Sequence, residues 1–280
     1  MAKFSIIVVC LNAGERLHDT IASIQNQSCK DYEIIVKDGI STDGSIEKLL
    51  TDDRLRIFRK KDRGIYDAMN QAVKKAQGEY IYFLNCGDVF HDSDVLRQVK
   101  EQMENQEKKK KREEKGTKAG NAGKESKYIF YGDIYQRQTK ERVASNPSLD
   151  AFGCYRNVPC HQACFYCSSL MREKQFDIRY KVRADYEHFL WCFFRGGAET
   201  VYMPVLTADY EGGGFSETKE NRKLSVQEHR EIVGKYMSKG QVLKYRLIMT
   251  LTFARFRTWL AGNEMTSHVY NRIKGKVYRR

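Results

Sequence analysis

Apolar, β-rich runs alternate with helical patterns through the first hundred residues, and this alternation constrains the fold more than any other feature. The runs of strand character lie at residues 4–11, 32–37, 54–59 and 79–84, and helical patterns lie between them at 15–27, 45–50 and 64–76. Alternating strands and helices form βαβ units, whose parallel sheet binds ligands at the carboxyl ends of its strands. The sequence therefore predicts an α/β fold with a mostly parallel sheet flanked by helices.

Length and charge narrow the class of protein. A chain of 280 residues, 41% hydrophobic and with 3 prolines, is long enough for a proper core and is neither largely disordered nor collagen-like. Its 49 Lys and Arg exceed its 36 Asp and Glu by 13 charges. Such an excess suits nucleic acid, an anionic membrane surface or a phosphorylated substrate.

Cysteine usage and the N-terminal segment indicate a cytosolic protein. The 8 cysteines are spread along the chain, unlike the dense framework of a small secreted domain, so we expect reduced thiols. The apolar run at residues 4–11 passes directly into a polar loop, which favours a buried strand over a signal peptide. We find no run of about 18 apolar residues, the length that a spanning helix needs.

The pattern divides the chain into four segments. Residues 1–100 carry the alternating pattern, and residues 101–127 contain a charged run without large apolar residues, which predicts the end of a helix followed by a disordered basic insertion. Residues 128–224 are mixed α and β. Residues 225–280 are helical and basic in pattern, with Glu264 as the one acid after residue 235.

Two acids directly follow predicted strands and are candidate functional residues. Asp38 begins the run Asp38-Gly-Ile-Ser-Thr-Asp-Gly44, where a carboxylate can accept from a base or a ribose, although a simple strand-to-helix turn has the same composition. Asp88 ends Leu84-Asn85-Cys86-Gly87-Asp88 and suits a divalent metal held against substrate phosphates, or else a cap of the next turn.

Seven motifs follow one another along the chain. They are Asp38-Gly-Ile-Ser-Thr-Asp-Gly-Ser, Asp62-Arg-Gly-Ile-Tyr-Asp-Ala-Met-Asn-Gln-Ala, Gly78-Glu-Tyr-Ile-Tyr-Phe-Leu-Asn-Cys-Gly-Asp88, Tyr131-Gly-Asp133, His161-Gln-Ala163, Ala184-Asp-Tyr-Glu187 and Gly212-Gly-Gly-Phe-Ser216. In this order they resemble the family 2 glycosyltransferases, specifically the non-processive bacterial members that build O-antigen, capsule or exopolysaccharide units. The match runs from Phe4 to about Ser216.

The resemblance implies a GT-A fold, a nucleotide-diphosphate sugar donor, a manganese or magnesium ion and inversion at the anomeric carbon. Asp38 matches the acid that contacts uracil, Asp88 matches the last acid of the metal motif, and Asp185 matches the catalytic base. Asp185 also suits the start of a helix. The remaining matches lie on the nucleotide-sugar side (Asn12, Asp62, Gly64, Asp67, Asn70, Asn85) and on the acceptor side (Asp133, His161, Gln162).

The chain departs from the family pattern at three places. Asn85 replaces the first acid of the metal motif, which implies a low metal affinity or a metal held largely by the phosphates. Leu11 stands where many relatives have a tyrosine, so the question of which side chain stacks on the nucleotide base stays open. The Q-x-x-R-W motif of processive synthases is absent after Asp185, where Arg195 is followed by Gly196, so we expect one sugar per encounter.

Two further segments allow alternative readings. The cysteines at 160, 164 and 167 allow a zinc site, but a strand would point their side chains to opposite faces and no second Cys/His pair follows at finger spacing. Residues 242–260 mix aliphatic, aromatic and basic side chains, which favours a helix in the membrane interface over one packed on the catalytic domain.

Together these features predict a metal-dependent inverting transferase. It would move one hexose or N-acetylhexosamine from a UDP-sugar to an undecaprenyl-diphosphate-linked saccharide, at the cytoplasmic inner leaflet of an anionic membrane and without nucleic acid as partner. The alternative is a non-catalytic binder of nucleic acid or anionic glycan that uses the basic segments, and its binding would weaken steeply with salt.

Overall fold

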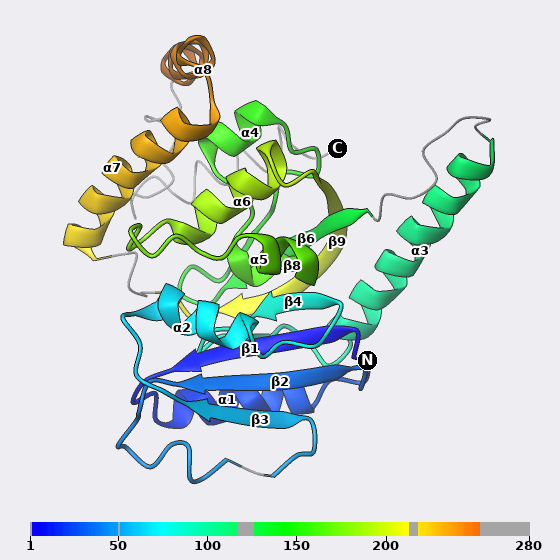
Figure 1. Ribbon diagram of the computed structural model, residues 1–280, viewed down its shortest axis with the longest axis vertical. Coiled ribbons are helices and arrows are strands. Elements are labelled where there is room, and N and C mark those ends of the chain that lie inside the picture. Colours follow the sequence, from blue (N-terminus) through cyan, green and yellow to red (C-terminus); the bar gives the residue numbers. More distant parts are fainter. Residues whose placement is uncertain (1, 50, 117–125, 213–217, 253–280) are drawn as a thin grey trace. The chain divides into compact units, whose positions relative to one another are not determined.

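The computed structural model describes residues 2–49, 51–116, 126–212 and 218–252. Residues 1–229 form one compact unit, and residues 230–280 form a second. Within the described residues of the first unit, one sheet has the strand order β3-β2-β1-β4-β8-β6-β9-β5, with β7 paired to β6 (Figure 1). The strands are β1 (Phe4–Cys10), β2 (Tyr32–Asp38), β3 (Leu55–Arg59), β4 (Tyr80–Phe83), β5 (Val89–Phe90), β6 (Lys127–Gln136), β7 (Glu141–Val143), β8 (Cys164–Cys167) and β9 (Ala198–Tyr210).

The first half of the sheet is the expected parallel one. β3, β2, β1 and β4 are parallel neighbours. Helix α1 (Glu15–Gln25) covers one face, and α2 (Ile65–Val73) packs over β1 and β2 on the other (Figure 1). The expected α/β architecture, a sheet flanked by helices, is confirmed.

The second half of the sheet is mixed. β8 is antiparallel to both β4 and β6, whereas β9 runs parallel to β6. The helices of this half are α3 (Val95–Gly116), α4 (Ala151–Arg156), α5 (Ser168–Glu173) and α6 (Ala184–Phe194), together with the short 3-10 turn η1 (His161–Ala163). Because β8 runs against β4, its first residues lie beside the last residues of β4.

The core follows from strand alternation. Phe4, Ile6 and Val8 of β1 are fully buried and join a cluster with Leu17 and Ile21 of α1. The other face is apolar as well, since Ile7 is buried below the α2 side. A strand buried on both faces has the continuous apolar run that residues 4–11 show.

Two expected elements differ. The predicted helix at 45–50 is a series of turns as far as residue 49, because the segment is too short to nucleate and the Ser45 side chain bonds Asp43 instead. Conversely, α3 extends to Gly116, well into the insertion expected to be disordered. Met103 on α3 is fully buried, and Lys110 lies 3.3 Å from Glu199, so α3 is held by packing and ion pairs. Residues 117–125 lie outside the described residues.

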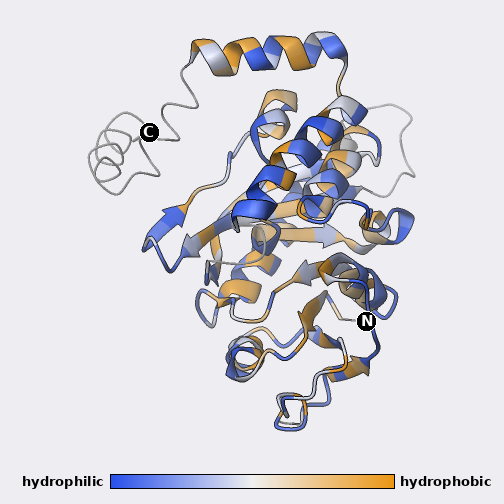
Figure 2. Ribbon diagram, turned by 90° about the vertical axis from the view of Figure 1, so that its left-hand side faces the viewer, coloured by the Kyte–Doolittle hydropathy of each residue, from blue (hydrophilic) through white to orange (hydrophobic). Residues whose placement is uncertain are grey.

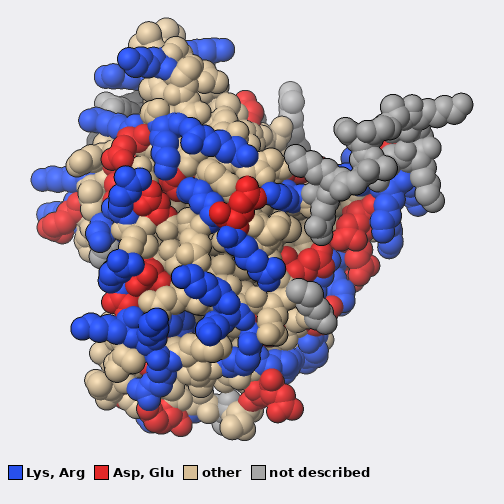
Figure 3. Space-filling view, viewed as in Figure 1, with Lys and Arg blue, Asp and Glu red and all other residues tan. Residues whose placement is uncertain are grey.

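Basic side chains do not gather into one patch on the face drawn in Figure 3, where Lys and Arg are spread over the surface with Asp and Glu among them. Lys110 and Lys3, for example, pair with Glu199 and Glu107. Such pairing suits a solvated surface better than a continuous phosphate-binding track.

The expected basic helical tail is described only in part. α7 (Lys219–Tyr236) and α8 (Lys239–Leu251) are helical, and residues 253–280 lie outside the described residues. α8 begins with a capping box between Ser238 and Gln241. Hydrophobic and hydrophilic residues follow each other along α8 (Figure 2).

Candidate active site

The loops after β1, β2 and β4 meet at one edge of the sheet, because these strands are parallel neighbours. η1 and the start of β8 come to the same edge from the antiparallel direction. This edge is the place where an open α/β sheet binds its ligands.

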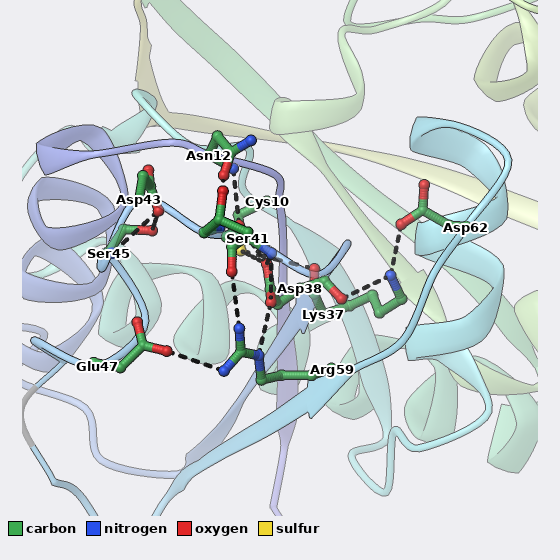
Figure 4. A network of polar contacts seen from close by, with 11 residues as sticks. Cys10, Asn12, Lys37, Asp38, Ser41, Asp43, Ser45, Glu47, Arg59 and Asp62 are labelled. Carbon is green, nitrogen blue, oxygen red and sulfur yellow. Dashed lines mark hydrogen bonds and ion pairs between the residues drawn. The ribbon is translucent and has the colours of Figure 1, made fainter.

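Asp38, at the end of β2, lies in a closed polar network (Figure 4). Its side chain is fully buried, and its oxygens accept from the Ser41 amide at 3.0 and 3.1 Å and from the Ser41 hydroxyl at 2.5 Å. Arg59 Nε donates to Asp38 Oδ2 at 3.1 Å, and its Nη1 reaches Glu47. Asp38 thus fixes the loop after β2. A contact between Asp38 and the nucleotide base of a donor stays a prediction.

Asn12 joins the loops after β1 and β2. Its backbone N–H donates to the Ser41 hydroxyl at 2.8 Å, and its side-chain oxygen accepts from the Thr42 backbone N–H at 2.9 Å. Asn12 and Ile40 have positive φ angles of 49° and 76°, a region that a β-branched residue such as Ile40 rarely adopts. Leu11 and Ile40 are 59% and 47% exposed, so these two tied loops present apolar side chains to solvent.

Asp62 approaches the end of β2 from the loop before α2. A Cβ atom added at Gly39 would lie 3.1 Å from Asp62 Oδ2 and 3.2 Å from Leu11 Cδ1. The same oxygen lies 2.6 Å from Nζ of Lys37, whose side chain is 1% exposed. Gly39 therefore leaves room for the Asp62 carboxylate, which a buried lysine holds in place.

The other motif residues around α2 hold the helix. Gly64 precedes α2 with a φ of 121°, and Asp67 in the first turn accepts from the Arg63 amide at 3.0 Å. Both polar atoms of the Asn70 side chain bond the backbone of Phe176, each at 2.9 Å. Asn70 thus clamps the chain after α5 onto α2.

Each oxygen of the Asp88 carboxylate accepts one hydrogen bond. Its side chain is buried, Oδ1 accepts from the Glu211 amide at 3.0 Å and Oδ2 from Gln162 Nε2 at 2.9 Å. Burial raises its pKa, against the lowering effect of these hydrogen bonds. The described residues contain no group of three or more His, Cys, Asp or Glu that could hold a metal. The role of Asp88 as a metal ligand stays a prediction.

The exposed carboxylate beside the loop after β4 is that of Glu211 rather than that of Asp88. Gly87 has a φ of 98°, and a side chain there would collide with the Glu211 carboxylate. Glu211 follows β9 directly, is 44% exposed and lies 3.7 Å from Arg16. The glycine at 87 therefore leaves room for an acid from a distant part of the chain.

Asp185 lies in the first turn of α6, one residue after the helix begins, where the helix dipole favours a negative charge. Tyr66 of α2 donates its hydroxyl to Asp185 Oδ1 at 2.9 Å, and the same hydroxyl reaches the Val182 carbonyl. His161 Nδ1 lies 3.5 Å from Asp185 Oδ2. Unlike Asp38 and Asp88, the Asp185 side chain is 27% exposed.

The surroundings of Asp185 favour its ionised form. Burial raises the pKa of its carboxyl, but the hydrogen bond and charge of His161 and the hydrogen bond from Tyr66 together hold that pKa below its usual range. The Tyr66 hydroxyl keeps its proton, because burial and the nearby Asp185 charge raise its pKa well above the usual value. Asp185 is therefore a carboxylate at neutral pH, with free lone pairs.

Asn85 and His161, which are 76 residues apart, are neighbours here. Asn85 Nδ2 lies 3.0 Å from His161 Nε2. The His161 side chain is 20% exposed. The structure thus brings together Asn85, His161 and Asp185 from the expected site.

The remaining acceptor-side residues are internal. Asp133 is fully buried and accepts from Arg142 Nε at 2.8 Å, the Ser145 amide at 2.7 Å and the Tyr202 hydroxyl at 3.0 Å. Gln162 is buried and bonds Asp88. Their positions support the walls of the site, and direct contacts with an acceptor stay predictions.

A pocket of about 530 Å³ opens beside Asp185. Its lining includes His161, Asp185, Tyr186, Arg156 and Arg183. The Arg183 guanidinium is fixed, because Nε donates to the Ser225 carbonyl and hydroxyl at 3.0 and 2.7 Å. The pocket therefore combines one ionised acid with two cations.

Tyr66, Arg59 and Glu211 were not singled out as site residues from the sequence. Tyr66 lies within the motif that begins at Asp62, but the sequence does not reveal that its hydroxyl contacts an acid 119 residues away. Glu211 directly precedes the last motif, whose residues after Gly212 lie outside the described residues.

The cysteine cluster has no metal-like geometry among the described residues. Cys160 and Cys164 instead donate to Gln162 and to a backbone carbonyl. All 8 cysteines are free thiols, as expected.

Comparison with known proteins agrees with this geometry. Residues 5–154 match the model of the family "Glycosyl transferase family 2". The chain is 32% identical over 264 residues to a PGL/p-HBAD biosynthesis glycosyltransferase of Mycobacterium tuberculosis, covering 91% of this chain and 90% of the relative. A poly(ribitol-phosphate) beta-N-acetylglucosaminyltransferase of Staphylococcus aureus, TarP, is 34% identical over 99 residues, 33% of this chain and 30% of that protein.

Two solved structures share the fold. TarS 1-349 of S. aureus in complex with UDP-GlcNAc has a TM-score of 0.65 and 14% identity, covering 96% of this chain and 78% of that one. The mannosyltransferase PcManGT of Pyrobaculum calidifontis, in complex with GDP-Man and Mn2+, has a TM-score of 0.60 and 14% identity, covering 99% and 81%. The chain is a glycosyltransferase and belongs to glycosyl transferase family 2.

Proposed function

We propose that the protein transfers a single hexose or N-acetylhexosamine, with inversion, from a UDP-sugar to a lipid-linked saccharide in the synthesis of a bacterial surface polysaccharide. One observation carries the proposal: Asp185 is ionised, partly exposed, and lies on the wall of a pocket large enough for a sugar. The scaffold acids Asp38, Asp88 and Asp133 lack this combination.

The chemistry is an in-line displacement. The acceptor hydroxyl enters from the pocket and gives its proton to Asp185 as its oxygen attacks the anomeric carbon. The bond from that carbon to the diphosphate breaks, and the electron pair leaves with the diphosphate oxygen. Tyr66 keeps the Asp185 carboxylate oriented through its hydrogen bond to Oδ1.

The donor site is assigned to the tied loops after β1 and β2. Leu11 and Ile40 offer an apolar surface for a base, and Asp62 offers a carboxylate beside them. Uridine is proposed from the family resemblance and from the neighbour that was solved with UDP-GlcNAc. A neighbour solved with GDP-Man makes guanosine the competing base.

A phosphate-bearing acceptor suits the pocket. Arg156 and Arg183 line it and provide cationic groups for a phosphate, as an undecaprenyl-diphosphate-linked saccharide would require. The relative with 32% identity is named for PGL/p-HBAD biosynthesis.

A manganese or magnesium requirement stays a prediction. Each Asp88 oxygen already accepts one hydrogen bond, from the Glu211 amide and from Gln162. A cation with one or two protein ligands would depend on the donor phosphates for the rest of its shell. We expect Mn2+ alone to leave the melting temperature unchanged.

Binding of UDP, GDP and dTDP, each with and without Mn2+, tests the donor assignment. Calorimetry should give binding that is selective for UDP and is strengthened by Mn2+. Transfer from a panel of radiolabelled UDP-sugars to membrane lipid extract then tests the reaction. Absence of binding by every nucleotide under both conditions would overturn the donor site.

Peripheral binding at the inner face of the plasma membrane is proposed from α8. Leu243, Leu247 and Leu251 recur every four residues and are 69%, 57% and 68% exposed, with Lys244 and Arg246 on the same helix. Apolar anchors beside basic residues are typical of an interfacial helix. No helix in the part of the chain that the structure describes is long and apolar enough to cross a membrane.

Vesicle flotation tests this proposal. The wild type should float with phosphatidylglycerol vesicles, and a variant with Leu243, Leu247 and Leu251 changed to Ser should not. The control is Val226→Ser on α7, which removes an exposed apolar residue outside α8. Equal flotation of all three proteins would contradict the assignment.

A further inference from the structure

We infer that Glu228 of α7 is a positioning residue for Asp185. It acts through the peptide group that joins Val182 to Arg183 and through the hydroxyl of Tyr66. The inference rests on the proposed role of Asp185 as the base. The sequence pattern places Glu228 in the basic helical tail and gives it no role at the site.

Glu228 is a buried acid that bonds three consecutive backbone N–H groups. Its side chain is 5% exposed. Oε1 accepts from the N–H of Lys181 at 2.7 Å. Oε2 accepts from the N–H groups of Val182 and Arg183, at 3.0 and 2.8 Å. Because both oxygens are held by backbone groups, Glu228 fixes the chain directly before α6.

The start of α6 has no side-chain cap of its own. The N-cap residue, Arg183, makes no capping hydrogen bond through its side chain, whereas Ser, Thr, Asp or Asn would usually supply one there. Glu228 instead holds the backbone at this point from another helix. Asp185 lies two residues further on, so its position depends on a contact that comes from α7.

One peptide group links Glu228 to the proposed base. The N–H of Arg183 and the carbonyl of Val182 belong to the same planar unit. Glu228 accepts from its N–H, and the Tyr66 hydroxyl donates to its carbonyl at 2.9 Å. The same hydroxyl donates to Asp185 Oδ1 at 2.9 Å. A rotation of this peptide group would therefore displace the hydroxyl that orients Asp185.

Two neighbours of Glu228 on α7 contact the same wall of the pocket. Ser225 accepts from the Arg183 guanidinium through its carbonyl and its hydroxyl. The His229 ring stacks on Tyr186, with 5.3 Å between ring centroids. Arg183 and Tyr186 both line the pocket beside Asp185. The first half of α7 thus supports this wall, and Glu228 supplies its contact to the backbone before the base.

Amide hydrogen exchange of the full chain tests the contact itself. In Glu228→Gln one acceptor oxygen becomes an NH2 group, which cannot accept, so at least one of the three backbone N–H groups loses its partner. Exchange at residues 181–183 should become about tenfold faster, relative to exchange in β1. An unchanged ratio would overturn the inference.

Steady-state kinetics test whether the contact serves the base. Glu228→Gln should lower kcat about tenfold with the donor KM unchanged, because displacement of a catalytic group lowers turnover and not donor binding. In a Tyr66→Phe background it should lower kcat by less than about threefold further, because the hydroxyl through which Glu228 acts is already absent. Losses that multiply to about a hundredfold in the double variant would contradict action through Tyr66.

A matched control is Glu33→Gln. Glu33 is also buried, and it accepts from the N–H groups of Gln77 and Gly78 at 2.6 and 3.1 Å. It lies near the start of β2, at the edge of the sheet opposite the site. This variant should lower the melting temperature but keep the wild-type kcat below that temperature. An equal fall in kcat in both variants would contradict positioning, because loss of stability alone would then explain it.

Glu228→Asp is the second variant, and it carries the test if Glu228→Gln does not fold. It keeps both acceptor oxygens but withdraws them by one methylene group, so its fall in kcat should be smaller than that of Glu228→Gln. Assay of Asp185→Asn in parallel separates this inference from the proposed function. An inactive Asp185→Asn with a wild-type kcat in the Glu228 variants would overturn this inference alone. A fully active Asp185→Asn would overturn the proposed function.

Discussion

Asp38 and Asp185 are acids of equal prominence in the sequence, yet they lie in opposite environments. Asp38 is fully buried, and Ser41 and Arg59 occupy its oxygens. Asp185 is 27% exposed, keeps free lone pairs and faces a pocket. A carboxylate with every oxygen occupied stabilises a loop, and one with spare lone pairs at a pocket can exchange a proton. The difference in exposure and in free lone pairs therefore distinguishes an acid that stabilises the fold from an acid that can take part in catalysis.

The largest effect on stability is expected at the structural acid. Asp38→Ala leaves the Ser41 amide without its acceptor and removes the partner of Arg59, which should lower the free energy of unfolding by about 3 kcal/mol. Urea denaturation measures this loss. Asp53→Ala, at an exposed acid in the loop before β3, is the control. A stable Asp38→Ala variant that has lost only donor binding would contradict this contrast. It would instead support the prediction that Asp38 contacts the nucleotide base.

A smaller effect is expected at the hydroxyl that orients the base. Tyr66→Phe removes one hydrogen bond from Asp185 and should lower kcat about tenfold, equivalent to about 1.4 kcal/mol. Steady-state transfer assays measure kcat, and the donor KM should stay unchanged. An unchanged kcat would mean that the carboxylate needs no orientation by Tyr66.

The smallest effect concerns pH. The pKa of Asp185 is lowered in the fold, so the active carboxylate is fully present above its ordinary pKa of about 3.9 and is lost only as pH falls through the lowered value. The stability that Asp185 contributes follows the same direction. The profile of kcat/KM should therefore be flat down to about pH 5, and Tyr66→Phe should move its acid limb upward. A limb near neutrality in the wild type would contradict an ionised base.

The sequence predicts the sheet better than the site, for physical reasons. The strand at residues 4–11 has an apolar run that is buried on both faces, so its pattern alone identifies it. Residues 45–49 do not form the predicted helix, because the Ser45 side chain makes a local hydrogen bond to Asp43 instead. Helix α3 continues to Gly116, within the segment predicted to be disordered, because Met103 packs in the core, a tertiary contact that the local pattern does not show.

The site depends on contacts across long stretches of chain. Motif spacing placed Asn85, His161 and Asp185 at strand and helix ends, where topology brings them together. It could not reveal that Asn70 clamps Phe176 or that Glu211 lies against Gly87, because both depend on side-chain direction in the folded chain.

The most direct test of the central claim is the Asp185→Asn variant, assayed for UDP-sugar transfer and, in parallel, for donor binding by calorimetry. The account predicts a fall in kcat of about 10²–10⁴, the usual loss for a general base, with donor affinity and melting temperature close to wild type. Wild-type turnover in this variant would show that Asp185 is not the base and would contradict the account.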